Sequence, residues 1–347
     1  MPTIGTSPRT GKDNSLHMAL TKKKRISLTV ILSIVVVVLA VAVGGGIFAL
    51  TLAQKFDGQT EKIDDPFPDE ANRPAKTDTG AQNILLLGSD TRGEIGDKEL
   101  DNIKGDRSDS MMVLHIPGDR SGVYITSFMR DSWVPIPGHG SAKINAAMAY
   151  GGPKLAVEVV EKLINTRIDH VAVIDFDGFE KLTDALGGVT INNPIAFTAM
   201  HGKQYFKEGE ITLSGTDALS FVRERYSFKD GDYQRARNQQ LYMKGVMNKL
   251  LSKETLTNPG RVIESIDALA PFLKVDSGLN AGFAAGLAPS MANVRGEDVQ
   301  FITAPTTGTG TSPDGQSIVR LDDAKMGQLA TAFQTDKLEE YFAANKK

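Results

Sequence analysis

The pattern of apolar and polar positions divides the chain into a long uncharged run, a polar stretch and a body of alternating elements. In the body, short apolar runs predict strands, and apolar positions at helical spacing predict helices. The predicted strands are 83–87, 111–116, 123–128, 171–175, 189–191 and 298–303. The predicted helices are 153–164, 178–186, 232–251, 262–273 and 281–287. Because strands alternate with helices, we expect an α/β fold in which a mixed sheet is covered by helices on both faces.

The uncharged run covers residues 26–53, which is 28 positions. Since about 20 apolar residues span a bilayer core, this run predicts a single transmembrane anchor. Basic residues dominate 22–25 before it and acidic residues dominate the segment after it. The positive-inside rule therefore predicts a cytoplasmic tail at 1–25 and an extracytoplasmic body. A cleaved signal peptide is the alternative, although its apolar region is usually about 7–15 residues long.

The polar stretch that follows predicts the domain organisation of the exported part. Residues 54–80 are rich in Asp, Pro, Thr and Lys and have no apolar periodicity, so they predict a linker. One catalytic domain is expected over 81–335, followed by a C-terminal tail at 336–347.

Charge and composition exclude several classes of function. The chain has 347 residues and a net charge of -3, with +5 in residues 1–25 and therefore -8 in the remainder. An acidic body lacks the basic footprint of a nucleic-acid-binding protein, so no nucleic-acid partner is expected. The absence of cysteine excludes disulfides, thiolate metal sites and cysteine nucleophiles. The five histidines lack metal-ligand spacing, and there is no Walker loop or Gly-x-Ser-x-Gly elbow.

Acidic and basic side chains gather instead at the ends of predicted strands. Those next to 83–87, 111–116 and 123–128 are Asp90, Arg92, Asp109, Arg130 and Asp131. Each has an ordinary explanation, such as a turn residue for Asp90 or a surface ion pair for Arg130 and Asp131. Together they indicate a diphosphate site, because arginine forks bind phosphate and a pair of carboxylates suits Mg²⁺.

A second group of such residues lies near the start of the long helix predicted at 232–251. Arg223 and Arg225 are two positions apart, so in an extended segment both side chains would point to one face. Asp232, Arg235, Asn238 and Gln239 follow at helical spacing, and Asp232 could equally be a helix N-cap. The arginines of this group would add to the same anion site.

Several motifs occur in order between residues 83 and about 251. They are 83–92, 107–112, 130–138, 143–147, 149–152, 187–189, 213–219, 223–225 and 232–240. On these motifs the chain resembles the LytR-CpsA-Psr family, the wall-polymer ligases of mainly Gram-positive bacteria. A short cytoplasmic tail, one anchor and an outside body are also the usual layout of that family.

The resemblance implies a three-layer α/β/α sandwich whose apolar cavity takes a polyprenyl chain. The implied reaction moves a glycan-1-phosphate from a membrane lipid, a polyprenyl diphosphate, to a hydroxyl of peptidoglycan, with Mg²⁺ (or Mn²⁺). By motif, Asp90 and Asp109 would bind the metal and, with Arg130, would be catalytic; either aspartate could accept the acceptor's proton. The residues implied to surround the diphosphate are Arg92, Arg107, Arg130, Lys143, Arg223, Arg225, Arg235 and Gln239.

Two positions depart from the family pattern, and three other functions remain as alternatives. Asn238 stands where an arginine commonly precedes two glutamines, with Arg237 one residue earlier, and Met129 stands where proline is common. The same site could serve a pyrophosphatase or a ligase that modifies a protein. A membrane-bound regulator or attenuator is the third alternative, although a tail of 25 residues leaves no room for a helix-turn-helix. The identity of the polymer stays open.

Overall fold

The computed structural model describes residues 51, 53–89, 108–200, 203–253, 258–287 and 289–345. Residues 49–347 form one compact unit. The predicted cytoplasmic tail, and all of the predicted anchor except residues 51 and 53, lie outside the described residues. Among the helices that can be described, none is both long and apolar enough to cross a membrane.

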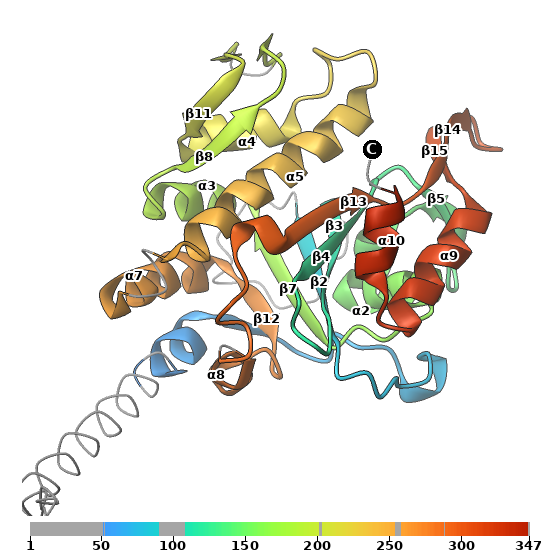
Figure 1. The fold of residues 1–347 in the computed structure, drawn as a ribbon. Coiled ribbons are helices and arrows are strands. Elements are labelled where there is room, and N and C mark those ends of the chain that lie inside the picture. Colours follow the sequence, from blue (N-terminus) through green and yellow to red (C-terminus); the bar gives the residue numbers. More distant parts are fainter. Residues whose placement is uncertain are drawn as a thin grey trace, which may run out of the picture. The chain divides into compact units, whose positions relative to one another are not determined.

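A seven-stranded sheet forms the centre of this unit (Figure 1). Its order is β1 (Glu61–Ile63), β12 (Lys274–Asp276), β7 (His170–Asp175), β2 (Gln82–Ser89), β3 (Ser108–Ile116), β4 (Val123–Phe128) and β13 (Val299–Thr303). The pairs β1–β12, β7–β2 and β4–β13 are parallel, and the other pairs are antiparallel. The mixed central sheet expected from the sequence is therefore confirmed. Strands β2, β4, β7 and β13 all end at the edge where β3 begins.

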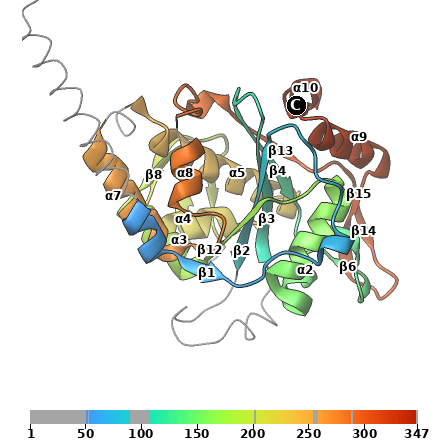
Figure 2. The same cartoon turned by 90° about the horizontal axis from the view of Figure 1, so that it is seen from below.

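Helices lie on both faces of the sheet (Figures 1 and 2). One face packs against α2 (Ala146–Ile164), α9 (Asp323–Gln334) and α10 (Leu338–Asn345). The other face packs against α5 (Gly231–Leu250) and α8 (Ala281–Leu287). Alternation along β3 explains both contacts, because Met111 and Val113 point into the first core while Met112 points into the second.

A further apolar cluster lies beside α5, away from the central sheet. It is built by α3 (Phe176–Ala185), α4 (Gly215–Arg223), α7 (Pro259–Leu269) and the hairpin of β8 (Val189–Asn193) with β11 (Gly209–Leu213). Phe221 is fully buried at its centre. This cluster fixes the end of α4 against α5, and so positions the connection between the two helices.

The remaining elements are short. Three hairpins join β5 (Trp133–Ile136) to β6 (Gly140–Lys143), β9 (Phe197–Thr198) to β10 (Tyr205–Phe206), and β14 (Thr306–Thr311) to β15 (Ser317–Leu321). The 3₁₀ turns are η1 (Glu70–Asn72), η3 (Ala270–Phe272) and η4 (Gly296–Asp298).

The segment 54–80 differs from the linker that its composition predicts. Residues 53–59 are helical, and β1 forms an edge of the central sheet through its pairing with β12. The Lys55 amino group lies 2.7 Å from a carboxylate oxygen of Asp267, and Asp57 accepts a hydrogen bond from the Ala281 backbone N–H at 3.0 Å. Since only isolated apolar residues such as Ile63 are buried, no periodic pattern marks this segment in the sequence.

The segment 336–347 likewise differs from the expected tail. Helix α10 buries Leu338 and Phe342, which are one helical turn apart, in the core on the α2 side of the sheet. Phe342 meets the ring of Tyr124 edge-on, with the ring centroids 5.2 Å apart. Two apolar residues are too few to predict a packed helix, but they are enough to hold this one in place.

Candidate functional site

The sequence predicts the site at the edge of the sheet where β2 and β4 end and β3 begins (Figure 1). Ser89, the last residue of β2, pairs with Ser108, the first residue of β3. Asp90, Arg92 and Arg107 lie outside the described residues, as does the side chain of Asp109, whose backbone belongs to β3. Within the described part of the chain, no three His, Cys, Asp or Glu side chains form a group that could hold a metal ion.

A tight turn after β4 presents Arg130 and Asp131. Three backbone hydrogen bonds hold it: the Arg130 carbonyl accepts from Asn145 at 3.2 Å, the Asp131 carbonyl from Val319 at 2.9 Å, and the Met129 carbonyl from Ser132 at 2.8 Å. Asp131 is only 7% exposed, so it is not part of an ordinary ion pair on the surface. The turn therefore fixes the backbone positions of Arg130 and Asp131.

The hairpin of β5 and β6 adds a third charged group. Lys143 is the last residue of β6, opposite Trp133. Its amino nitrogen lies 3.2 Å from Oδ1 of Asp131, and Nε of Arg130 lies 3.8 Å from the same oxygen. The Asp131 carboxyl is thus held between two cations.

The connection between α4 and α5 carries the next group, in a conformation that the sequence did not predict. Residues 221–223 are the end of α4, so the segment is not the continuous extended one on which a common face of Arg223 and Arg225 depends. Glu224 ends the helix, and its buried carboxylate accepts hydrogen bonds from the backbone N–H of Met200 at 2.6 Å and of Ser227 at 2.9 Å. Burial raises the pKa of Glu224, but these N–H donors outweigh burial and lower it. The ionised Glu224 anchors the connection next to Arg225.

Two arginines contact the carboxylate of Asp232 at the start of α5. Its Oδ1 lies 3.0 Å from Nη2 of Arg235, one turn later, and accepts a hydrogen bond from Nη1 of Arg225 at 3.5 Å. Arg225 also donates to the Tyr226 hydroxyl at 2.6 Å. The position suits a carboxylate, because the first turn of a helix favours negative charge.

The two groups meet through their carboxyls. The side chains of Asp131 and Asp232 lie close enough to share a hydrogen bond when one of them is protonated. Burial, followed by the hydrogen bond and negative charge of Asp232, raises the pKa of Asp131. The pKa of Asp232 is lowered, because the hydrogen bond from Asp131 and the charges of three arginines outweigh the effect of burial. Four of the predicted cations therefore surround one carboxyl pair; they are Arg130, Lys143, Arg225 and Arg235.

Two other predicted residues lie on the same elements. Arg223 is exposed at the end of α4. Gln239 is half-buried and follows Arg235 by four residues, so both lie on one face of α5. Gln240 ties this helix to the strand ends by donating to the hydroxyls of Ser127 at 3.2 Å and Thr303 at 3.1 Å.

Asp131 and Asp232 were not among the predicted binding residues. Asp232 is the second residue of α5, and the N-cap position belongs to Asp230. The spacing of Asp232 and Arg235, three residues apart, was the available sequence signal for their ion pair. No such signal could link Asp131 to Asp232, because their elements are far apart in the sequence.

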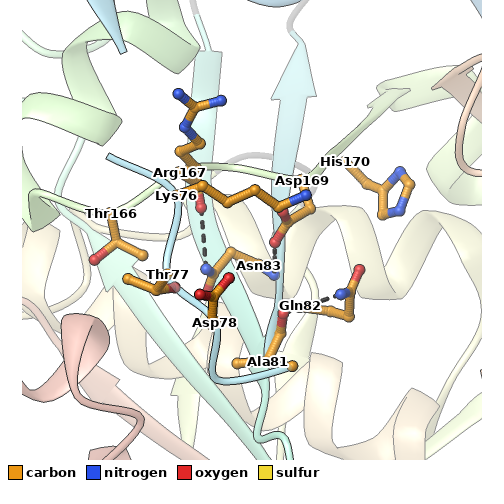
Figure 3. Close-up of a pocket in the computed structure, with 11 residues that line it drawn as sticks. Lys76, Thr77, Asp78, Ala81, Gln82, Asn83, Thr166, Arg167, Asp169 and His170 are labelled. Carbon is orange, nitrogen blue, oxygen red and sulfur yellow. Dashed lines mark hydrogen bonds between the residues drawn. The ribbon is translucent and has the colours of Figure 1, made fainter. Parts of the chain in front are cut away.

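A pocket of about 530 Å³ lies at the opposite edge of the sheet, where β2 and β7 begin. Figure 3 shows Asn83 at its floor, donating to the Arg167 carbonyl and the Asp169 carboxylate at 3.0 and 2.8 Å. Its other lining residues include Lys76 and His170, and it contains none of the predicted site residues. It is therefore separate from the arginine cluster.

Comparison with known proteins agrees with the resemblance. The model of the LytR_cpsA_psr family matches residues 47–335. A cell wall biosynthesis protein, LcpA of Corynebacterium glutamicum, is 32% identical over 294 residues, which cover 74% of this chain and 55% of that protein. The chain thus spans little more than half the length of this relative. A polyisoprenyl-teichoic acid–peptidoglycan teichoic acid transferase, TagU of Bacillus anthracis, is 34% identical over 229 residues, which cover 65% of this chain and 72% of that protein.

A solved structure of TagT bound to LI-WTA shares the fold with a TM-score of 0.60 and 25% identity, covering 78% of this chain and 98% of that one. The family model covers well over half of this chain, including both groups of arginines. We conclude that the chain belongs to the LytR-CpsA-Psr family.

Proposed function

We propose that this protein transfers a glycan-1-phosphate from a polyprenyl diphosphate to a hydroxyl of peptidoglycan. The observation that carries the proposal is that four cations, from four elements of the chain, face one pair of carboxyl groups. A diphosphate diester carries two negative charges, and arginine forks are suited to binding them. The names of the relatives LcpA and TagU support a role in wall assembly.

In the proposed reaction the acceptor oxygen attacks the phosphorus that bears the glycan. A new P–O bond forms, the P–O bond to the lipid phosphate breaks, and the acceptor loses its proton. Negative charge develops on the transferring group and on the leaving polyprenyl phosphate. Arg130, Arg225 and Arg235 would stabilise this charge, which is the main requirement of phosphoryl transfer.

The proposal includes a divalent metal ion held by Asp90 and Asp109. Both residues offer the carboxylate oxygens that Mg²⁺ prefers, and both adjoin the paired ends of β2 and β3. Bound there, Mg²⁺ (or Mn²⁺) would help to neutralise the negative charge of the phosphate oxygens.

An apolar path for the polyprenyl chain is part of the same proposal. Met243 and Met247 lie four and eight residues after Gln239 on α5, so they continue its face of the helix away from the arginines. They pack, half-buried, against the sheet, next to Leu86, Leu114 and Phe301. Such side chains suit a lipid that is held by its diphosphate at the strand ends. In this proposal residues 26–53 anchor the protein in the cell membrane with the domain outside.

A transfer assay with the full chain in mild detergent tests the proposal. The donor is a disaccharide on a short polyprenyl diphosphate, the acceptor is a peptidoglycan oligomer, and Mg²⁺ is present. Mass spectrometry should detect a phosphodiester adduct together with polyprenyl monophosphate. Loss of one such donor typically slows a reaction about 10²–10³-fold, so we expect that reduction for Arg130→Ala. Arg261→Ala, an exposed change on α7, is the matched control and should retain the wild-type rate.

The other outcomes are distinct. Polyprenyl monophosphate without an adduct would identify a pyrophosphatase, and an adduct formed only with a protein acceptor would identify a protein ligase. Binding of the donor without any turnover would favour a regulator. A wild-type rate for Arg130→Ala would contradict the proposed site.

A further inference from the structure

Two carboxyl groups occupy the middle of a site that is proposed to bind an anion. Asp131 lies on the turn after β4 and Asp232 lies in the first turn of α5, so each belongs to a different layer of the domain. The charged groups that face the pair are Arg130 from the turn, Lys143 from β6, Arg225 from the α4–α5 connection and Arg235 from α5. Two negative charges at this position would oppose the binding of a diphosphate.

We propose that Asp131 and Asp232 act as one carboxyl pair that positions the two groups of cations and, by gaining or losing a single proton, sets how strongly the site binds a diphosphate diester. This inference rests on the diphosphate site of the proposed function. It makes the two aspartates positioning residues, since they would act through the cations and not on the reacting atoms.

The geometry explains how one proton would act. With the proton present, the carboxyls share a hydrogen bond and oppose the four cations with one negative charge. Without it, they repel each other and oppose the cations with two negative charges. At separations of a few ångströms, one unit of charge changes a binding constant by on the order of tenfold or more, even at an effective dielectric constant of about 20. The diphosphate should therefore bind more tightly when the pair holds its proton.

The surroundings favour Asp131 as the residue that carries the proton. Oδ1 of Asp131 is buried and accepts no hydrogen bond, although Lys143 lies 3.2 Å away. Asp232 instead has two arginine partners, at 3.0 and 3.5 Å. In agreement, burial and the neighbouring Asp232 raise the pKa of Asp131, while the pKa of Asp232 is lowered. The pH at which binding weakens is then set by Asp131.

Binding of P¹,P²-dimethyl diphosphate to the full chain in detergent tests the inference. This probe keeps its two charges across the pH range, and EDTA excludes any metal ion. Calorimetry from pH 4.5 to 8 should show wild-type affinity falling, on the order of tenfold, as the pH rises through the pKa of Asp131. Asp131→Asn keeps a hydrogen-bond donor next to Asp232 and cannot ionise. It should therefore retain the tight binding and lose the pH dependence.

A second variant and a control keep the test decisive. Asp232→Asn leaves Asp131 able to ionise but removes the neighbouring negative charge, so its pH profile should shift to lower pH, while its weaker hold on Arg235 lowers affinity. Asp119→Asn, an exposed change on the β3–β4 turn, should keep the wild-type profile. If either pair variant kept that profile, or if the wild type bound tightly without pH dependence, the inference would be overturned and the diphosphate site would stand. If the wild type did not bind the probe at any pH, both would fail.

Discussion

A single buried amide, Asn238, explains how this chain departs from the family pattern near its arginines. Asn238 is completely buried, donates a hydrogen bond to the Phe221 carbonyl at 3.1 Å and accepts one from the Gln234 amide at 2.9 Å. It therefore fastens α5 to the end of α4. Arg237, one residue earlier, is on a more exposed part of the helix and pairs with Asp230 and Gln234. Position 238 therefore serves the contact between α4 and α5 in this chain.

Replacement of Asn238 tests this structural role. In Asn238→Ala the Phe221 carbonyl and the Gln234 amide lose a buried partner, so the free energy of unfolding should fall by about 1–3 kcal/mol. Urea denaturation of the full chain in detergent measures the change. Asn192→Ala, an exposed change on β8, is the control and should have little effect. Equal stability of the two variants would show that the hydrogen bonds of Asn238 are not needed.

For individual residues, the sequence predicted the cations of the site better than the two aspartates that they contact. Strand ends and motifs predict Arg130, Lys143, Arg225 and Arg235, and the structure brings all four together. The carboxyl pair at their centre could not be predicted, since it depends on how the turn after β4 meets the start of α5. The roles of Asp90, Arg92 and Arg107 stay predictions. So does the metal site that Asp90 and Asp109 would form.

Among the elements, long apolar runs were predicted well and short ones were missed. Strands β2, β4 and β7 follow the predicted ranges closely because each contains a run of apolar, mostly buried residues. Helix α10 and strand β1 each depend on one or two buried side chains, which give no periodic signal. Helix α4 ends at Arg223 because Glu224 takes up hydrogen bonds from Met200 and Ser227, a tertiary contact that local pattern does not contain.

The contribution of α10 can be measured directly. Phe342 is 3% exposed and packs in the core beside Tyr124, so Phe342→Ala should lower the free energy of unfolding by about 3–5 kcal/mol. Glu340→Ala on the exposed side of the same helix is the matched control and should change it little. Thermal and urea denaturation both report the difference. A loss below about 1 kcal/mol for Phe342→Ala would mean that this segment behaves as the tail predicted from the sequence.

Across the whole unit, two histidine–aspartate pairs hold distant parts of the chain to the central sheet. Asp276 of β12 lies 3.2 Å from Nδ1 of His170 in β7 and accepts the Val171 backbone N–H at 2.9 Å. Asp336, just before α10, lies 2.8 Å from Nε2 of His115 in β3. Both pairs lie at the same edge of the sheet, because His115 and His170 are on the two strands that flank the start of β2.

The Asp276 pair predicts sensitivity to acid. Burial raises the pKa of Asp276, but its hydrogen bonds from His170 and Val171 outweigh burial, so its pKa in the folded state lies below the ordinary 3.8. The stabilisation is therefore present above about pH 4 and is lost as the pH falls through the lowered pKa. Asp276→Asn should lose about 1.5–3 kcal/mol at pH 7 and show a weaker decline toward pH 3 than the wild type. Urea denaturation at pH 7, 5, 4 and 3 measures the free energy of unfolding, with Asp119→Asn as the control. If Asp276 were not responsible, the wild type and Asp276→Asn would lose stability in parallel as the pH falls.

The pairing of β1 with β12 has a consequence for where wall polymer can be joined. A free linker of the 27 residues 54–80 would extend up to about 90 Å, so the site could work over a wide range of heights above the bilayer. Residues 53–63 are instead fastened to the domain by Lys55, Asp57 and β1. In the proposed membrane topology, the domain would therefore not be held by a free linker of this length. The reach of the site above the bilayer would then depend more on the folded domain than on a flexible tether.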